Sequence, residues 1–100
     1  DMAQYVNNLV MDLRHLHMET SRNARIAIRI GKIEMVPETA IPCGLIINEL
    51  VSNSLKHAFP HDFRGNPEII ISISTMPENT IELEVSDNGI GLPEKFNTQI

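Results

Sequence analysis

The chain has 100 residues, which is enough for one domain or part of one. Its hydrophobic content of 42% indicates a globular fold, and its net charge of −5 argues against a nucleic-acid surface built on bulk positive charge. No apolar run approaches the roughly 18 residues that would span a bilayer. The single cysteine, Cys43, excludes an internal disulfide and favours a reducing compartment, so we expect a cytoplasmic domain.

The N-terminal third predicts a helix followed by a strand. Apolar residues recur at three- and four-residue spacing over residues 1–17, which is typical of an amphipathic helix. His15 and His17 lie near its end, where a positive charge suits the helix dipole, and we assign them no phosphoacceptor or metal role. Alternation over residues 25–30 predicts a strand, and we expect residues 33–35 to extend it after a kink at Gly31.

The rest of the chain predicts a second helix and two more strands. We expect residues 36–41 to be an approach segment and the helix to run from about Pro42 until Pro60 ends it. Residues 61–67 form a polar loop, residues 68–75 and 80–86 form an antiparallel hairpin, and residues 95–100 are too few to assign. The expected architecture is a partial α+β two-layer sandwich with two helices over a mixed sheet.

One face of the second predicted helix carries an unusual set of polar side chains. Glu49, Asn53 and Lys56 fall within an arc of roughly 60° on a helical wheel. The opposite side is apolar and is expected to be buried; it contains Ile47, Leu50, Val51, Leu55 and Ala58. A carboxylate, a carboxamide and an ammonium on one face suit a pocket for a phosphate and a divalent cation. Asn53 could offer an oxygen to Mg²⁺, Lys56 could pair with phosphate, and Glu49 could orient or deprotonate a nucleophile.

A glycine-containing turn follows the last predicted strand. Asp87, Gly89 and Gly91 form a D-x-G-x-G pattern, which alone is only a common turn sequence. If this strand lies beside the second helix, however, the turn opens the same pocket as the polar helix face. Asp87 could then accept a hydrogen bond from the amino group of adenine, and the glycines would let a base or loop approach the backbone.

These two stretches resemble the nucleotide-binding motifs of a known family. Residues 48–59, NELVSNSLKHAF, resemble the N box of sensor histidine kinases, and residues 85–93, VSDNGIGLP, resemble their G1 box. The sequence of these two boxes is most similar to that of histidine kinases of the HisKA_2 type, and residues 39–42 also resemble that group. Both boxes occur in the wider ATPase superfamily shared with DNA gyrase, Hsp90 and MutL, whose fold is a two-layer α/β sandwich.

The resemblance implies a role for each matching position. Asn53 would be the Mg²⁺ ligand, and Glu49 would hold the acidic N-box position, where many histidine kinases have Asn. Lys56 and His57 would contact phosphates, and Asp87 would bind the adenine amino group. Gly89 and Gly91 would shape the adenine pocket and the start of the ATP lid.

The resemblance also implies the activity and partners of the protein. ATP and Mg²⁺ would be the cofactors, and a histidine would be phosphorylated before transfer to an aspartate of a response regulator. Residues 1–100 would be the front part of the ATP-binding domain, inactive by itself, within a homodimeric parent whose phosphoacceptor domain lies elsewhere. The alternatives are an ATPase of the gyrase, Hsp90 or MutL sort using Glu49 to activate water, a non-catalytic nucleotide-binding or scaffold module, and a fold without a ligand.

Overall fold

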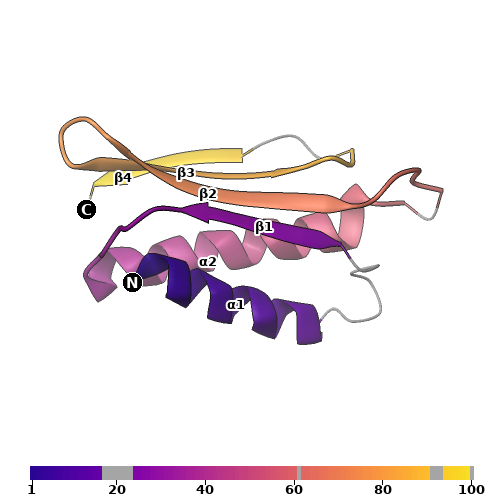
Figure 1. The fold of residues 1–100 in the computed structure, drawn as a ribbon, viewed down its shortest axis with the longest axis horizontal. Coiled ribbons are helices and arrows are strands. Elements are labelled where there is room, and N and C mark those ends of the chain that lie inside the picture. The colour runs from indigo at the N-terminus through magenta and orange to yellow at the C-terminus, as the bar shows by residue number, and fades with distance from the viewer. Residues whose placement is uncertain (17–23, 61, 91–93, 100) are drawn as a thin grey trace.

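The computed structural model describes residues 1–16, 24–60, 62–90 and 94–99 as two layers (Figure 1). Two helices lie on one face of a four-stranded sheet. The elements in chain order are α1 (Met2–Leu16), β1 (Arg25–Ile30), α2 (Pro37–Asn53), the π-helical turn η1 (Ser54–Ala58), β2 (Glu68–Met76), β3 (Thr80–Asp87) and β4 (Glu94–Gln99). The expected α+β class, with two helices over a mixed sheet, is confirmed.

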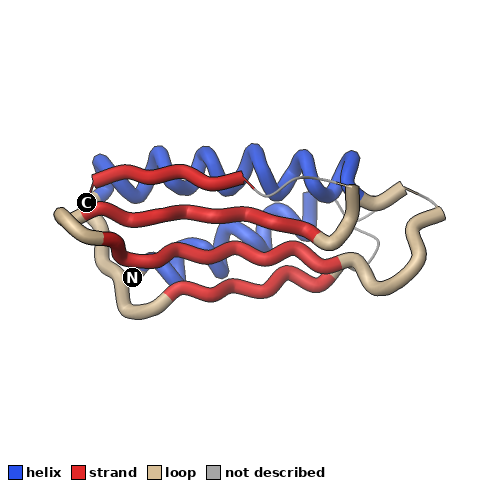
Figure 2. The backbone as a smooth tube through the Cα atoms, turned by 90° about the horizontal axis from the view of Figure 1, so that it is seen from above, coloured by secondary structure: helices blue, strands red, loops and turns tan. Residues whose placement is uncertain are grey.

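The strands lie side by side in sequence order, β1-β2-β3-β4 (Figure 2). β1 pairs with β2 in parallel, so the chain must cross over between them, and α2 with η1 makes this connection. β2 and β3 form the expected antiparallel hairpin, and β3 pairs antiparallel with β4. The helix that carries the predicted polar face therefore packs directly beneath the strand that ends at Asp87.

The core lies between the helices and the sheet. Alternate residues of β2 and β3 point into it, which gives both strands a buried–exposed period of two. The fully buried larger side chains are Val6, Ile47, Val51, Ile69, Ile71, Ile81 and Leu83. At about 1.5–3 kcal/mol for each buried aliphatic side chain, this cluster is the main term that holds α2 against the sheet.

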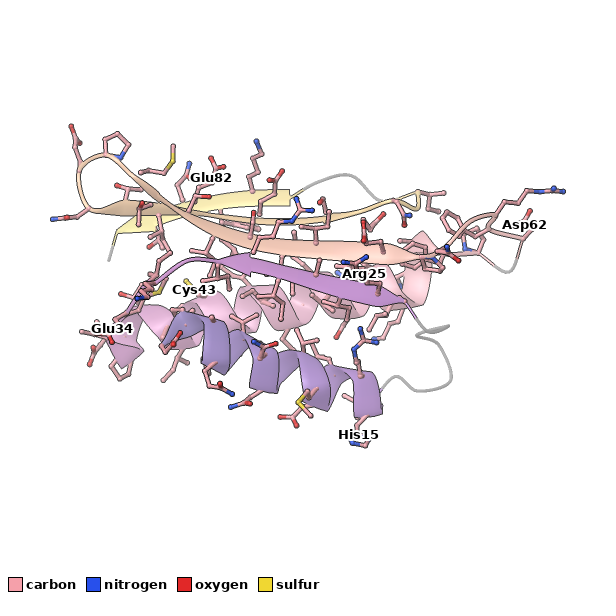
Figure 3. All side chains as sticks on the ribbon, viewed as in Figure 1. His15, Arg25, Glu34, Cys43, Asp62 and Glu82 are labelled. Atoms are coloured by element: carbon pink, nitrogen blue, oxygen red, sulfur yellow. The ribbon has the colours of Figure 1, made fainter. Side chains whose placement is uncertain are left out.

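The opposite face of the sheet is polar. Glu82 points away from the helices, whereas Cys43 of α2 lies on the core side (Figure 3). Two partly exposed ion pairs cross neighbouring strands on this face, Arg25–Glu68 at 3.6 Å and Lys95–Glu84 at 3.9 Å. Exposed pairs of this kind contribute about 1 kcal/mol or less, so the face is a solvated surface and not a second core.

Gly44 allows the two helices to approach closely. A Cβ at this position would overlap the Tyr5 ring, whose hydroxyl lies against the backbone of α2. Gly44 is buried and Tyr5 is partly exposed, so the aromatic ring covers the glycine from the α1 side. Gly44 is therefore a packing glycine, whose missing side chain makes room for the ring.

Three features of the secondary structure differ from the sequence-based expectation. α2 begins at Pro37, not near Pro42, because Pro37 occupies its first turn and Pro42 is accommodated within the helix. Residues 31–36 form no strand extension, although Ile33 is buried against the core. The sequence left residues 95–100 unassigned, but residues 94–99 form β4 because their backbone completes a ladder with β3.

No helix within the described ranges has the length and apolarity that crossing a bilayer requires.

Candidate functional site

Strand periodicity directs Asp87 toward the helices. Ile81, Leu83 and Val85 of β3 are buried on the helix side, and Asp87 follows them on the same face as the last residue of the strand. The strand ends beside the C-terminal part of the α2–η1 segment. The pocket hypothesis required the Asp87 carboxylate to lie on the Asn53 side of the sheet, and it does.

Both oxygens of the Asp87 carboxylate accept hydrogen bonds. The Gly89 backbone N–H donates to Oδ1 at 2.9 Å, and the Ser54 hydroxyl donates to Oδ2 at 3.0 Å. Ser54 directly follows Asn53, so the carboxylate lies against the end of the predicted N-box helix. The carboxylate is only partly buried, and its remaining lone pairs can accept from a ligand.

The backbone at the end of η1 lies so close to residue 89 that only a glycine fits there. A Cβ at Gly89 would overlap the carbonyl of Ala58, which accepts a hydrogen bond from the Ile90 N–H at 3.0 Å. The turn after β3 therefore packs directly on the last residue of η1. From its sequence motif, this glycine was expected to allow the approach of a base or loop; what approaches it in the structure is Ala58.

Asn88 ties the other side of the same turn to the start of β2. Its side-chain oxygen accepts from the Glu68 N–H at 2.8 Å, and its side-chain nitrogen donates to the Asn66 carbonyl at 2.8 Å. The Asn88 backbone N–H also donates to the Glu68 carbonyl at 3.1 Å. Asp87 is thus flanked by contacts to the helix end on one side and to the β2 loop on the other.

The polar face of α2 and η1 is open to solvent. Glu49, Asn53, Lys56 and His57 are all exposed. The apolar side of the same segment is mostly buried, and only Leu50 is half-buried there. The ion pairs among the described residues are those on the outer sheet face, so the charges of Glu49 and Lys56 are not used in a salt bridge there. These side chains are available to a ligand lying beyond the helix end.

The sequence did not predict the π-helical turn or the role of Ser54. Ser54 begins η1, and its backbone N–H donates to the carbonyls of both Leu50 and Val51, so α-helical bonding continues up to the start of the π-helical turn. Short π-helical turns occur frequently at functional sites. The only sequence signal was the adjacent pair Asn53 and Ser54, two residues that favour α-helix interiors poorly.

The remaining candidate residues are Cys43, the possible metal ligands, Gly91 and His17. Burial raises the pKa of the Cys43 thiol, so it remains protonated and acts as a small core residue. Among the described residues, no group of three His, Cys, Asp or Glu side chains could hold a metal ion. Gly91, assigned to the pocket, and His17 lie outside the described residues.

Comparison with known proteins gives the family. Residues 38–99, which include α2, η1 and the turn after β3, match the family described as "Histidine kinase-, DNA gyrase B-, and HSP90-like ATPase". The chain belongs to this ATPase family. Membership implies ATP binding, and the matched range contains the two stretches whose geometry is described above.

Relatives of this ATPase domain include histidine kinases. The chain is 27% identical over 94 residues to blue-light-activated histidine kinase 2 of Erythrobacter litoralis, covering 93% of this chain and 26% of the relative. Its fold is similar to that of the blue-light activated histidine kinase of Erythrobacter litoralis EL346, with a TM-score of 0.76, 24% identity and coverage of 93% and 28%. The separately solved kinase domain of that protein gives a TM-score of 0.73 at 24% identity, with coverage of 93% and 41%. The ATPase domain thus spans about a quarter of its curated relative.

We expect Gly89→Ala to destabilise this ATPase domain by about 1–3 kcal/mol, because the added methyl group overlaps a backbone carbonyl that cannot rotate away. Urea unfolding measures the change. Gly31→Ala is the matched control, since nothing lies within 4 Å of its added Cβ. Equal unfolding midpoints for the two variants would contradict the close packing of Gly89 on Ala58.

Proposed function

We propose that this chain is the ATP-binding catalytic portion of a sensor histidine kinase, which phosphorylates a histidine and then passes the phosphoryl group to an aspartate of a response regulator. The observation that carries the proposal is the 3.0 Å hydrogen bond from Ser54 to Asp87, which joins the predicted N box to the predicted G1 box. The similarity to histidine kinases, in preference to other members of the ATPase family, supports the choice of activity.

Each proposed role follows from the chemistry and location of the side chain. Asp87 accepts the adenine amino group through lone pairs that Gly89 and Ser54 leave unused. Lys56 and His57, exposed at the helix end, contact the phosphates. Glu49 lies one turn before Asn53 and orients the nucleophile.

Magnesium fits the donor set through Asn53. Mg²⁺ commonly takes one or two protein ligands together with phosphate oxygens and water, so a site without a cluster of protein ligands suits it. Asn53 is an exposed carboxamide next to the residue that contacts Asp87, and its oxygen would hold the ion. When bound, the ion neutralises charge on the phosphate oxygens.

The chain's own contribution to the reaction is positioning. The bond from the γ-phosphorus to the bridging oxygen breaks, a bond to an imidazole nitrogen forms, and ADP leaves. Phosphoryl transfer of this kind needs mainly alignment and charge stabilisation. The anchored carboxylate of Asp87 fixes the base, and the cation of Lys56 attracts the phosphates, so the γ-phosphoryl group is held at the exposed end of α2.

The proposal includes the organisation of the whole protein. Because the chain spans 26% of its curated relative, we propose that residues 1–100 are the front part of the ATP-binding domain of a longer cytoplasmic or membrane-anchored kinase. Gly91 and the residues around it would continue into the lid. The phosphoacceptor histidine, the dimerisation helices and the receiver domain of a response regulator complete the proposed set of partners.

Labelling tests the activity directly. We expect the full-length protein, incubated with Mg²⁺ and ATP labelled at the γ-phosphate, to acquire protein-bound phosphate that is stable in base and labile in acid. ATP labelled at the α-phosphate is the control and should leave the protein unlabelled. Steady phosphate release without a phosphoprotein would instead indicate that the protein is an ATPase. An absence of nucleotide binding would overturn both the kinase and the ATPase proposals.

A further inference from the structure

We propose that Ser54 is a positioning residue that orients the Asp87 carboxylate and thereby sets the selectivity of this site for the amino group of adenine. The inference rests on the proposed function, because it takes Asp87 as the group that contacts the base. The sequence patterns pointed to Asn53 and Asp87 but passed over Ser54.

The contact between Ser54 and Asp87 joins two elements far apart in the chain. The residues are 33 positions apart, and their hydrogen bond of 3.0 Å is part-buried. Ser54 is the first residue of η1, and Ala58, the last residue, accepts the hydrogen bond from Ile90. The π-helical turn η1 therefore makes two contacts with this region. The Ser54 side chain contacts the last residue of β3, and the Ala58 backbone contacts the turn after β3.

Two donors fix the plane of the carboxylate. The Gly89 N–H contacts one oxygen and the Ser54 hydroxyl contacts the other, so the group cannot rotate without losing one of them. A carboxylate offers about four lone-pair positions, and two remain for a ligand. With Ser54 removed, only the Gly89 contact would remain, and the free oxygen could turn away from the base.

The direction of the hydrogen bond determines what the site can recognise. An ionised carboxylate only accepts, so the Ser54 hydroxyl must be the donor, and its one proton is directed at Asp87. The hydroxyl and the carboxylate then present only acceptor lone pairs toward the pocket. Such a surface matches the donor amino group at purine position 6 and disfavours an oxygen there.

A thermodynamic cycle that combines a protein variant with a modified nucleotide tests this role in the full-length protein. Binding of ATP is compared with binding of purine riboside triphosphate, which has hydrogen in place of the 6-amino group. We expect Ser54→Ala to weaken ATP binding about fivefold and to change binding of the analogue less than about twofold. Ser54→Thr, which keeps a hydroxyl, should restore most of the ATP affinity. Ser74→Ala, at an exposed serine of β2, is the matched control and should alter neither ligand.

The outcomes separate this inference from the function on which it rests. Equal losses for both nucleotides in Ser54→Ala, or no loss for either, would overturn the positioning role, because a merely structural contact does not discriminate between the ligands. Asp87→Ala provides the reference. If that variant still prefers ATP over the analogue, the assignment of Asp87 to adenine fails; if it loses the preference while Ser54→Ala keeps it, only the role of Ser54 fails.

Discussion

Asp87→Ala should reduce ATP affinity of the full-length protein by at least about 100-fold and abolish autophosphorylation, while the domain stays folded. The variant loses a charge-assisted hydrogen bond to the base, which contributes about 1.5–3 kcal/mol. It also leaves the Gly89 N–H and the Ser54 hydroxyl without their shared acceptor, so the Ile90–Ala58 backbone hydrogen bond is left to hold the turn to the helix end. Calorimetric titration with Mg-ATP measures the affinity, and circular dichroism checks the fold.

The same substitution at an exposed aspartate of α1 is the control for lost charge. Asp12→Ala removes one carboxylate far from the turn and should bind ATP as the unmodified protein does. The core, which contains no part of the Asp87 side chain, should keep the Asp87→Ala variant folded. Unchanged ATP binding in Asp87→Ala would remove the adenine contact from the proposal.

Asn53→Asp should lower autophosphorylation by about 100-fold or more. It places a negative charge beside the position proposed for the triphosphate, and two like charges about 5 Å apart repel by about 3 kcal/mol at an effective dielectric constant of about 20. The new charge also lies near the C-terminal end of α2, where the helix dipole disfavours an anion. Initial rates of phosphoprotein formation measure the effect.

A second variant at the same position isolates the metal contact. Asn53→Ala adds no charge, and we expect it to raise the Mg²⁺ concentration needed for half-maximal activity while leaving metal-free nucleotide binding unchanged. Asn97→Ala, which makes the same chemical change on exposed β4, serves as the control and should leave the Mg²⁺ requirement unchanged; Asn97→Asp is the corresponding control for Asn53→Asp and should retain full activity. An unaltered Mg²⁺ requirement in Asn53→Ala would show that this residue is not the ligand.

Periodicity predicted the layers of the fold well because burial enforces it. The alternation of Ile81, Leu83 and Val85 placed one face of β3 against the helices. Asp87 continues the same alternation and therefore lies on the helix-facing side as well. β4 could not be assigned because residues 94–99 contain little apolar pattern, and the strand forms through backbone pairing with β3. The sequence placed the start of α2 too late because Pro42 resembled the first residue of a helix. In the structure Pro42 lies inside α2, which already begins at Pro37.

The contacts that organise the candidate site were less accessible to sequence reasoning. The motif identified Asp87, Gly89 and Asn53, but the partners of the turn depend on three-dimensional proximity. Nothing local to Ser54 or Ala58 indicates a π-helical turn, and their contacts to Asp87 and Ile90 join segments that are far apart in the chain. The side-chain contacts of Asn88 to the Asn66 and Glu68 backbone likewise join segments that the sequence separates by about twenty residues.

The double anchoring of the turn after β3 affects how a ligand would be received. Ala58 contacts the turn on the helix side, and Asn88 holds it on the β2 side, so the protein's own hydrogen bonds fix the wall that carries Asp87. A preorganised wall loses little conformational entropy when it is occupied, so more of the contact energy appears as affinity. Adenine docking should therefore be closer to lock-and-key than to induced fit.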